Sequence, residues 1–260
     1  YGSATVSIYL SDDGGTADGG VDETFTSTFT IAVTPVADTP SITDASTLED
    51  TQSTSGLVIS RNAVDGSEGT HFKITEITNG SLYQQDGVTG ISEDDFITYA
   101  QGSAGLRFDP EADFNGDGSF AIQASTGASV DDLGGSTVTT TIAVTAVNDV
   151  PTYSIGSNQS VDEDVLAQTV PNWASDISPG SSNESGQTLT FTLSNDNNAL
   201  FSSQPTVNSD GDLIYTPVAD AYGSATVSIY LSDDGGTADG GVDETFTSTF
   251  TIAVTPVADT

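Results

Sequence analysis

The chain has almost no basic residues: 3 Lys and Arg stand against 38 Asp and Glu, giving a formal net charge of −35. Nucleic acid is excluded as a partner because phosphate binding needs clustered Lys and Arg, and an anionic membrane surface is excluded for the same reason. Most carboxylates lack a salt-bridge partner, so their mutual repulsion opposes the compact state. We therefore expect bound cations, and oxygen ligands favour calcium or magnesium. The alternative is a solvated acidic surface.

Cysteine and methionine are absent, and there is one histidine, His71. The lack of cysteine excludes thiol catalysis and thiolate metal sites. No apolar run approaches the ~20 residues of a membrane helix, and no signal peptide is visible, so we expect any export signal to lie outside this stretch. Nothing resembles the strand–turn–helix environment of a catalytic serine. A non-catalytic protein is the prediction.

An internal repeat organises the chain. Residues 1–39 return without a change as residues 222–260, an offset of 221 residues. Self-similarity of this kind indicates a repeat protein. Two interpretations compete: a window from a much longer repetitive protein, which we favour, or a designed chain whose two ends carry the same module.

Apolar residues alternate with polar ones along most of the sequence. ATVSIYL (4–10) alternates with period two and meets the turn Asp12-Asp13-Gly14-Gly15, and TFTSTFTIAVTPV (24–36) gives a long second strand. Asp-Gly and Gly-Gly pairs supply the positive φ of tight turns. No stretch has a helical period. Strands at this spacing predict an all-β chain of Ig-like sandwiches.

Two longer segments are distant versions of each other. LRFDPEADFNG (106–116) aligns with LIYTPVADAYG (213–223), and TIAVTAVNDVP (141–151) aligns with TIAVTPVADTP (30–40). We therefore expect two complete modules of ~110 residues, 40–150 and 151–260, a length typical of such sandwiches. Residues 1–39 are then the C-terminal half of a third.

The module ends carry a family resemblance. IYLSDDGG…STFTIAVTPVADTP and TTTIAVTAVNDVP resemble the closing pattern of cadherin repeats, and the openings at residues 47–51 and 161–165 resemble the acidic motif of their first strand. VPNWASDISPG and SGQTLTFTLSNDNNALFS look like the cadherin-like tandem repeats of very large bacterial surface adhesins of the RTX type. The resemblance implies an extracellular, cell-surface extender that supports cell adhesion, with neighbouring repeats of the same chain as its partners.

The resemblance also implies Ca²⁺ at the module junctions, where acidic openings, linkers and turns offer the 6–8 oxygens that calcium takes. For the junction at 148–151 the candidate ligands are Asn148, Asp149, Asp162, Glu163, Asp164, and Asp131 or Asp132. For the junction at 36–40 they are Asp38, Glu49, Asp50, Asp12 and Asp13, and the last copy repeats the acids as Asp233, Asp234 and Asp259. The link Ala37-Asp38 departs from the family pattern because it lacks the asparagine of Asn148-Asp149.

Other interpretations of the sequence stay open. Asp113, Asn115 and Asp117 match the first half of an EF-hand loop, but residue 124 is Ala where the bidentate Glu belongs, which favours a hairpin turn.

A module that binds polysaccharide or another cell's surface would use exposed aromatic residues. The aromatic candidates for such a surface are Trp173, Tyr83, Tyr99 and Tyr153. For Trp173 we favour a place in the sandwich core. In a third interpretation, the open strand edges of residues 1–39 are completed by another chain, as in a filament.

Overall fold

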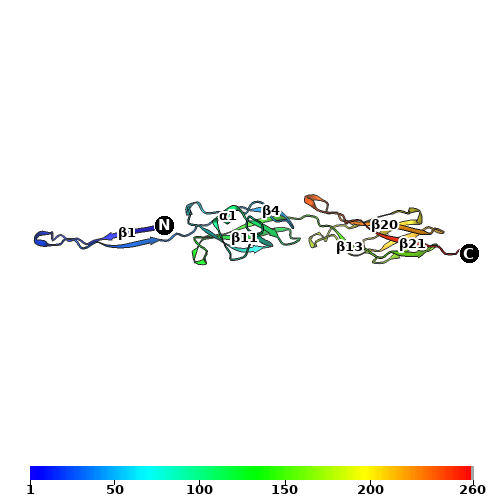
Figure 1. Ribbon diagram of the computed structural model, residues 1–260, viewed down its shortest axis with the longest axis horizontal. Coiled ribbons are helices and arrows are strands. Elements are labelled where there is room, and N and C mark those ends of the chain that lie inside the picture. Colours follow the sequence, from blue (N-terminus) through cyan, green and yellow to red (C-terminus); the bar gives the residue numbers. More distant parts are fainter. Residues whose placement is uncertain (259–260) are drawn as a thin grey trace. The chain divides into compact units, whose positions relative to one another are not determined.

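The computed structural model of the chain describes residues 1–258. These residues form two compact units (Figure 1). The first comprises Tyr1–Thr47, Thr51–Glu111 and Gly116–Val144, and the second comprises Leu48–Asp50, Ala112–Asn115 and the chain from Thr145 onwards. No helix in the described part of the chain is long and apolar enough to cross a bilayer.

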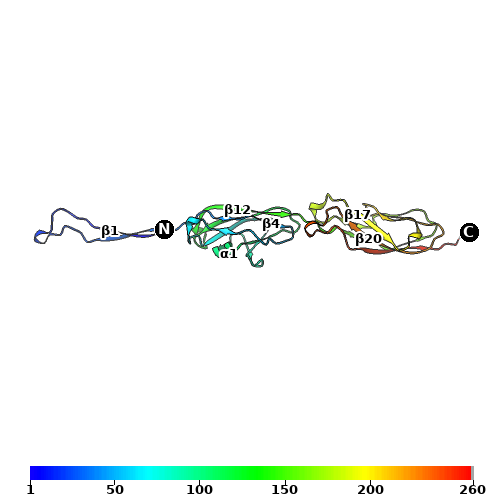
Figure 2. The ribbon, with the colours of Figure 1, turned by 90° about the horizontal axis from the view of Figure 1, so that it is seen from above.

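Strands make up most of the first unit. They are β1 (Gly2–Ile8), β2 (Ser27–Val33), β3 (Ser41–Ile42), β4 (Ala45–Leu48), β5 (Ile59–Ser60), β6 (His71–Thr78), β7 (Gly80–Tyr83), β8 (Gly90–Ile91), β9 (Phe96–Thr98), β10 (Arg107–Pro110), β11 (Gly116–Ser125) and β12 (Leu133–Thr145). One sheet has the order β4-β12-β11-β6-β9 and another has the order β10-β7-β8, while β3 pairs with β5 and β1 pairs with β2. The strands β1 and β2 form a sheet of their own, which Figures 1 and 2 show as a separate hairpin.

The second unit is also built of strands. They are β13 (Thr152–Ser154), β14 (Gln159–Asp162), β15 (Gln168–Val170), β16 (Ser175–Ser178), β17 (Thr190–Asn195), β18 (Phe201–Val207), β19 (Leu213–Pro217), β20 (Gly223–Ser232) and β21 (Ser248–Thr255). A four-stranded sheet, β14-β21-β20-β17, faces a three-stranded sheet, β15-β19-β18, and β13 pairs with β16. Alternate side chains of β20 and β21 are buried, as period-two patterning requires.

The core of the second unit lies between its two sheets. Tyr215 and Leu213 of β19 and Val227 and Ile252 of the facing sheet are fully buried. Trp173 is 5% exposed and its ring centroid lies 4.3 Å from that of Phe250. The prediction that Trp173 is a core residue is therefore confirmed, and this indole face is not available to a sugar.

One short helix contradicts the expectation that no helix would form. No helical period precedes residue 99 in the sequence, yet β9 ends at Thr98 and α1 (Tyr99–Ala104) follows. A capping box starts the helix: the Gln101 N–H donates to Thr98 Oγ1, and the Thr98 N–H donates to Gln101 Oε1 at 2.7 Å. The six-residue helix is too short to leave a visible periodicity, so only its cap marks it. The remaining helical turns are 3-10 helices at Ala17–Gly19, Ala63–Asp65, Val130–Asp132, Ser182–Glu184, Asn198–Leu200 and Ala238–Gly240.

Removing the cap gives a local prediction. Thr98→Ala is expected to cost about 1 kcal/mol of helix stability, because the N-cap hydroxyl satisfies an otherwise unpaired backbone N–H. Hydrogen exchange of the amides at 100–104 would measure the loss. Thr98→Ser keeps the hydroxyl and should exchange nearly as slowly as the unaltered protein; equal acceleration by Ala and Ser would contradict the capping role.

Candidate calcium-binding site

Asn148 and Asp149 lie at one end of the second unit, where loops of that unit hold them. The Asn148 amide group donates to Asp233 Oδ1 at 3.0 Å and to the Val242 carbonyl at 2.9 Å, and it accepts from Gln187 Nε2 at 2.7 Å. The Asp149 N–H donates to Glu184 Oε1 at 2.8 Å. These bonds fix the predicted Asn-Asp pair against the rest of the unit.

The close approach of Asn148 explains a glycine in the Asp-Asp-Gly-Gly turn. A Cβ built on Gly235 would collide with Asn148 Oδ1, so a side chain at this position would push Asn148 away. The turn itself is shaped by Asp233, whose Oδ1 accepts the Gly235 N–H at 2.9 Å. The motif therefore positions Asn148 as well as supplying carboxylates.

Three carboxylates come together on this segment. Glu49 and Asp50 follow β4: the Glu49 N–H donates to the Thr145 carbonyl at 2.9 Å, and the Val147 N–H donates to Glu49 Oε1 at 2.5 Å. The Asp113 N–H donates to Asp50 Oδ1 at 3.0 Å. Oxygens of Asp50, Asp113 and Asp149 all lie within 4.8 Å of one another. This is the only cluster of three or more such ligands among the described residues.

Several carboxylate oxygens here are buried without a hydrogen-bond partner. They are Glu49 Oε2, Asp149 Oδ2, Glu184 Oε2 and Asp233 Oδ2. Glu49 is 3% exposed and Glu184 is 7% exposed. A buried charge without a partner is costly, so each of these oxygens is an acceptor that a cation would satisfy.

No basic side chain forms a salt bridge with these carboxylates in the described part of the chain. Within residues 1–258 the single salt bridge joins Lys73 to Asp94 at 2.7 Å. Burial raises the pKa of Glu184 above its ordinary value, and the charges of Asp149 and Asp233 raise it further against the opposing effect of the Asp149 N–H. The carboxylates therefore repel one another in the absence of a cation.

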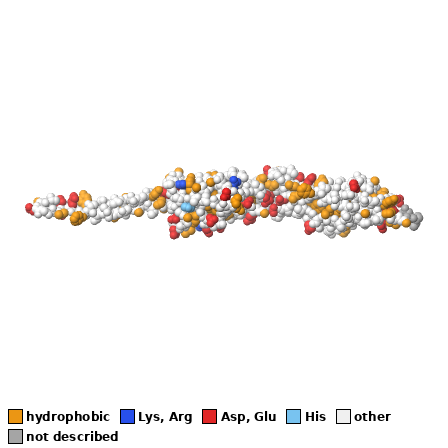
Figure 3. Space-filling model, viewed as in Figure 1, with side chains coloured by type: hydrophobic (Ala, Val, Ile, Leu, Met, Phe, Trp, Pro, Cys, Tyr) orange, Lys and Arg blue, Asp and Glu red, His pale blue; other side chains and the backbone are white. Residues whose placement is uncertain are grey.

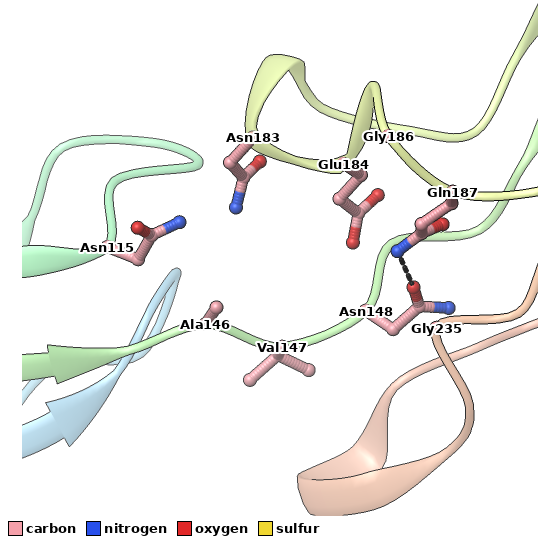
Figure 4. Close-up of a pocket in the computed structure, with 9 residues that line it drawn as sticks. All are labelled: Asn115, Ala146, Val147, Asn148, Asn183, Glu184, Gly186, Gln187 and Gly235. Atoms are coloured by element: carbon pink, nitrogen blue, oxygen red, sulfur yellow. Dashed lines mark hydrogen bonds between the residues drawn. The ribbon is translucent and has the colours of Figure 1, made fainter.

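An open pocket of about 450 Å³ lies beside these groups. Its walls include Asn115, Val147, Asn183, Glu184 and Gln187. Figure 4 shows the Glu184 carboxylate pointing from its loop toward the linker segment of residues 146–148, with Asn183 beside it and Asn115 on another loop. Glu184, whose Oε2 has no hydrogen-bond partner, therefore lines a space that water ligands of an ion could fill.

The donor set fits calcium. Carboxylate and amide oxygens are the hard ligands that calcium prefers, and no thiol or imidazole is among them. Asp50, Asp113 and Asp149 are the residues that would hold an ion together, and the unpartnered oxygens of Glu49, Glu184 and Asp233 are further acceptors on the same segment. A bound calcium would supply positive charge to the unpartnered oxygens of this segment.

The opposite end of the second unit carries a related arrangement. The Glu163 N–H donates to the Thr255 carbonyl at 2.9 Å, the Val257 N–H donates to Glu163 Oε1 at 2.8 Å, and the Asp220 N–H donates to Asp164 Oδ1 at 3.0 Å. Thr255 Oγ1 also donates to Asp162 Oδ1 at 2.6 Å. These bonds repeat those of Glu49, Asp50 and Asp113. Asp259, which corresponds to Asp149 in the aligned sequence, lies outside the described residues.

The expected grouping of the acidic openings is therefore wrong. We expected Asp162, Glu163 and Asp164 beside residues 148–151, but they lie beside residues 255–257. The reason is that β14 pairs in parallel with β21, so the opening strand carries its acidic end to the far end of the sheet. Likewise Glu49 and Asp50 bond to Thr145, Val147 and Asp113, which places them with the later linker and not with Asp38.

The segment around Asp38 has a different neighbour. The Asp38 N–H donates to both carboxylate oxygens of Asp65, at 2.9 and 3.1 Å, which matches the contact of Asp149 with Glu184. Asp65 is 3% exposed, and burial raises its pKa. Ala37 stands where Asn148 stands in the later linker, so the Asn148 contacts have no equivalent here.

The remaining predicted ligands lie in exposed turns. Asp12 accepts the Gly14 N–H at 2.9 Å within the hairpin of residues 1–39, and Asp13 is exposed beside it. Asp131 lies on the 3-10 helix Val130–Asp132, which is followed by β12. Asp234 accepts the Thr188 N–H at 2.8 Å, and this bond lowers its pKa. These residues do not join the cluster of Asp50, Asp113 and Asp149.

Three functional candidates were missed from the sequence. Asp113 was assigned to a hairpin turn, although its recurrence as Asp220 in the aligned segments was a usable signal. Glu184 and Asp65 left no signal, because the loops that carry them differ in length and sequence and only the fold brings each to a linker amide. Asp117, the third polar position of the EF-hand-like spacing, lies in β11 opposite Ala143.

The comparisons with solved structures identify the fold class. The chain is nearly all β, with facing sheets in tandem, and solved structures of cadherin ectodomain repeats match it. Human protocadherin-24 EC1-2 (form II) aligns with a TM-score of 0.54 at 8% identity, over 83% of this chain and 98% of that chain. Mouse cadherin-23 EC22-24 gives 0.49 at 16% identity, over 84% of this chain and 67% of that chain. Human mucin-like protocadherin EC1-2 gives 0.48 at 14% identity, over 85% and 100%.

No protein-family model and no curated protein matches the sequence. At these identities the likeness to the solved structures is one of fold. The predicted fold class, tandem cadherin-like β-sandwiches, is confirmed.

Proposed function

We propose that this chain is a non-catalytic extracellular spacer of a bacterial surface adhesin, stabilised by calcium at its linkers. The observation that carries the proposal is the set of buried, unpartnered carboxylate oxygens around residues 147–149. Calcium would take the place of Lys and Arg as the source of positive charge, which explains how so acidic a chain can fold with few basic residues. Neighbouring repeats of the same chain are the proposed partners, and calcium is proposed to restrict motion at the linkers.

Three of the four aromatic residues offered for a polysaccharide site contact other side chains of the protein, and the fourth, Tyr83, is half-buried in β7. Trp173 packs on Phe250, Tyr153 packs edge-on against Phe191 with centroids 5.2 Å apart, and the Arg61 guanidinium lies 3.5 Å from the centre of the Tyr99 ring. Their faces are engaged within the protein. The spacer is therefore the function we favour.

Calcium is expected to raise the melting temperature of the full chain, and chelation is expected to reverse the rise. Extracellular sites bind calcium at about 10⁻⁴–10⁻³ M, and an ion at a hundred times its Kd stabilises a site by roughly 2.7 kcal/mol. A thermal melt during calcium titration measures this stabilisation. Solution scattering with and without chelator measures whether the dimensions of the chain change when calcium is removed.

Two controls separate site binding from general screening. Potassium chloride at matched ionic strength screens the −35 charge without occupying the site. Magnesium demands shorter, octahedral coordination and should stabilise less than calcium. If calcium and matched potassium chloride gave the same melting temperature and the same length, the proposal would be wrong.

A further inference from the structure

The basic residues of the chain are confined to one stretch. Arg61, Lys73 and Arg107 are the only three, and no Lys or Arg occurs in residues 108–260. Figure 3 accordingly shows basic side chains on the first unit and none on the second. Lys73 forms the salt bridge with Asp94, and Arg107 donates to two backbone carbonyls. Arg61 has different surroundings, which place it near a linker.

The two linkers, residues 36–39 and residues 146–149, are anchored in the same way. The Asp38 N–H donates to both carboxylate oxygens of Asp65, and the Asp149 N–H donates to one carboxylate oxygen of Glu184. Each acceptor is the last residue of a 3-10 helix, and its own carbonyl accepts the N–H of the residue three positions later at 2.9 Å. Asp65 and Glu184 therefore hold equivalent places in the two units, 184 − 65 = 119 residues apart.

The two anchors differ in what surrounds the acceptor. Both oxygens of Asp65 accept a hydrogen bond, whereas Glu184 Oε2 accepts none. The Arg61 side chain also lies near Asp65: a Cβ built on Gly69 would be 3.2 Å from Asp65 Oδ2 and 3.7 Å from Arg61 Cδ. Burial raises the pKa of Asp65, and the Asp38 N–H and the positive charge of Arg61 act against this rise. Arg61 therefore favours the charged form of the first anchor.

The first unit holds the guanidinium in place. Arg61 Nη1 donates to the Gly66 carbonyl at 2.8 Å, and Arg61 Cζ lies 3.5 Å from the centre of the Tyr99 ring. A cation over an aromatic face is attracted to the ring and keeps its charge. Arg61 forms no direct salt bridge within residues 1–258, so its charge acts on Asp65 through space.

The second unit has no room for the same arrangement. The offset of 119 residues aligns Arg61 with Gly180. The φ of Gly180 is +146°, and a Cβ built there would collide with Glu184 Oε2. The neighbouring charges of Asp149 and Asp233 instead oppose the charged form of Glu184. An anchor of this kind lacks a cation of its own.

The backbone of the first linker is also held without charged groups. Ala37 is 1% exposed, and a Cβ built on Gly134 would collide with the Ala37 carbonyl oxygen. The Ser136 N–H donates to Thr39 Oγ1 at 2.8 Å. In the later linker, the residue in the place of Ala37 is Asn148, which donates to the carboxylate of Asp233. The first linker therefore depends on fewer carboxylates.

We propose that Arg61 is a tethered cation that stabilises the anchor of Asp38 on Asp65, in the way that a calcium ion stabilises the anchor of Asp149 on Glu184. This role rests on the proposed function, which takes calcium as the ion of the later linker. The anchor of Asp38 then persists when calcium is removed, whereas the anchor of Asp149 loosens. All groups of the first anchor lie between residues 36 and 136, within one unit.

Amide hydrogen exchange of the full chain, measured by NMR in calcium and in chelator, tests the two anchors separately. In the unaltered protein, the Asp149 N–H should exchange faster in chelator, and the Asp38 N–H should exchange at one rate in both. Arg61→Gln should speed exchange of the Asp38 N–H roughly fivefold in chelator. Arg61→Lys keeps the charge and should stay close to the unaltered protein. Slow exchange of the Ile74 N–H, in the core of the first unit, confirms that each variant is folded.

Arg107→Gln is the matched control for net charge. It removes one positive charge from the same unit, at a side chain that donates to the carbonyls of Gln85 and Ser53 and not to a linker. Exchange of the Asp38 N–H should be unchanged in this variant.

Asn183→Arg tests whether a tethered cation is sufficient at the later linker. Asn183 is exposed and lies beside Glu184 in Figure 4, so an arginine there can approach the carboxylate. In chelator, the variant should slow exchange of the Asp149 N–H. Its melting temperature, followed through Trp173 in the second unit, should rise less with calcium than that of the unaltered protein. Asn183→Gln is the neutral control and should behave as the unaltered protein does.

Three results would overturn the proposal. Unchanged exchange of the Asp38 N–H in Arg61→Gln would remove any role of Arg61 at the anchor. Equal acceleration by Arg61→Gln and Arg61→Lys would mean that packing on Tyr99 matters and the charge does not. An undiminished effect of calcium on Asn183→Arg would mean that a tethered cation cannot replace the ion.

Failure of the proposed function gives a different result. Exchange of the Asp149 N–H in the unaltered protein would then be the same in calcium and in chelator. Acceleration of the Asp38 N–H by Arg61→Gln and not by Arg61→Lys would, in that case, still confirm the tethered cation at the first anchor.

Discussion

Phe250→Ala is expected to lower the free energy of unfolding of the second unit by about 3–5 kcal/mol, the cost of emptying a large aromatic site in a core. Phe29→Ala, the same substitution at the duplicate position, is expected to change stability by less than about 0.5 kcal/mol. The difference follows from burial alone, since Phe250 is 3% exposed and Phe29 is 52% exposed in identical sequence surroundings. Urea unfolding followed by tryptophan fluorescence measures both, because Trp173 lies in the second unit.

The pair of variants controls for local sequence effects. Both hairpins lose the same side chain from the same strand register, so any change in β propensity or in the unfolded chain is shared. Unchanged denaturant slopes would confirm that only stability has changed. Equal losses in dilute protein would show that Phe29 is covered in solution and would contradict the exposed hairpin described above.

Glu184→Gln is expected to have opposite effects with and without calcium. Without calcium the buried Glu184 carboxylate is repelled by Asp149 and Asp233 and has one unpartnered oxygen, so a neutral amide should stabilise the second unit by on the order of 1 kcal/mol. The amide keeps one carbonyl oxygen, which can still accept the Asp149 N–H. With calcium the variant lacks a charged ligand, and a tenfold weaker Kd would remove about 1.4 kcal/mol of the ion's contribution.

Melting curves of the variant and of the unaltered protein are recorded in calcium and in chelator. The variant should melt at a higher temperature than the unaltered protein in chelator and at a lower temperature in calcium. Glu244→Gln is the matched control, since it removes the same charge from an exposed residue of the same unit. The control should respond to calcium as the unaltered protein does. If Glu184→Gln lowered the melting temperature equally in both buffers, Glu184 would be a structural hydrogen-bond acceptor only.

Local patterns predicted most of the fold. Period-two alternation at 4–10 and 24–36, carried by the repeat to the end of the chain, placed β20 and β21 within a few residues. Short strands such as β14 and β16 and the helix α1 were not predicted, because each owes its place to tertiary pairing or to a cap and not to a long periodic run. The alternation of apolar and polar residues along a strand predicts which of its faces is buried, but it does not predict which strand pairs with it.

The same limit explains the outcome for the site. Acidic residues of the openings and the linkers were recognised by type, and Asp50 and Asp149 do share a cluster. The acidic openings were grouped with the wrong linkers. The spacing of residues within a segment does not predict a long-range pairing such as that of β14 with β21. Glu184 could not be predicted, because its role depends on a loop folding back over the linker amide of Asp149.

The parallel pairing of β14 with β21 has a mechanical consequence. Gln159 lies opposite Ile252 and Asp162 lies opposite Thr255, so both strands run toward the same end of the second unit. Tension that enters the unit before β14 and leaves it after β21 pulls the two strands in opposite directions along their length. The hydrogen bonds between them then share the load in shear, and the strands cannot be peeled apart one bond at a time. Forced unfolding is governed by the rate at which such a barrier is crossed, so the strand order itself would slow the extension of this unit under pull.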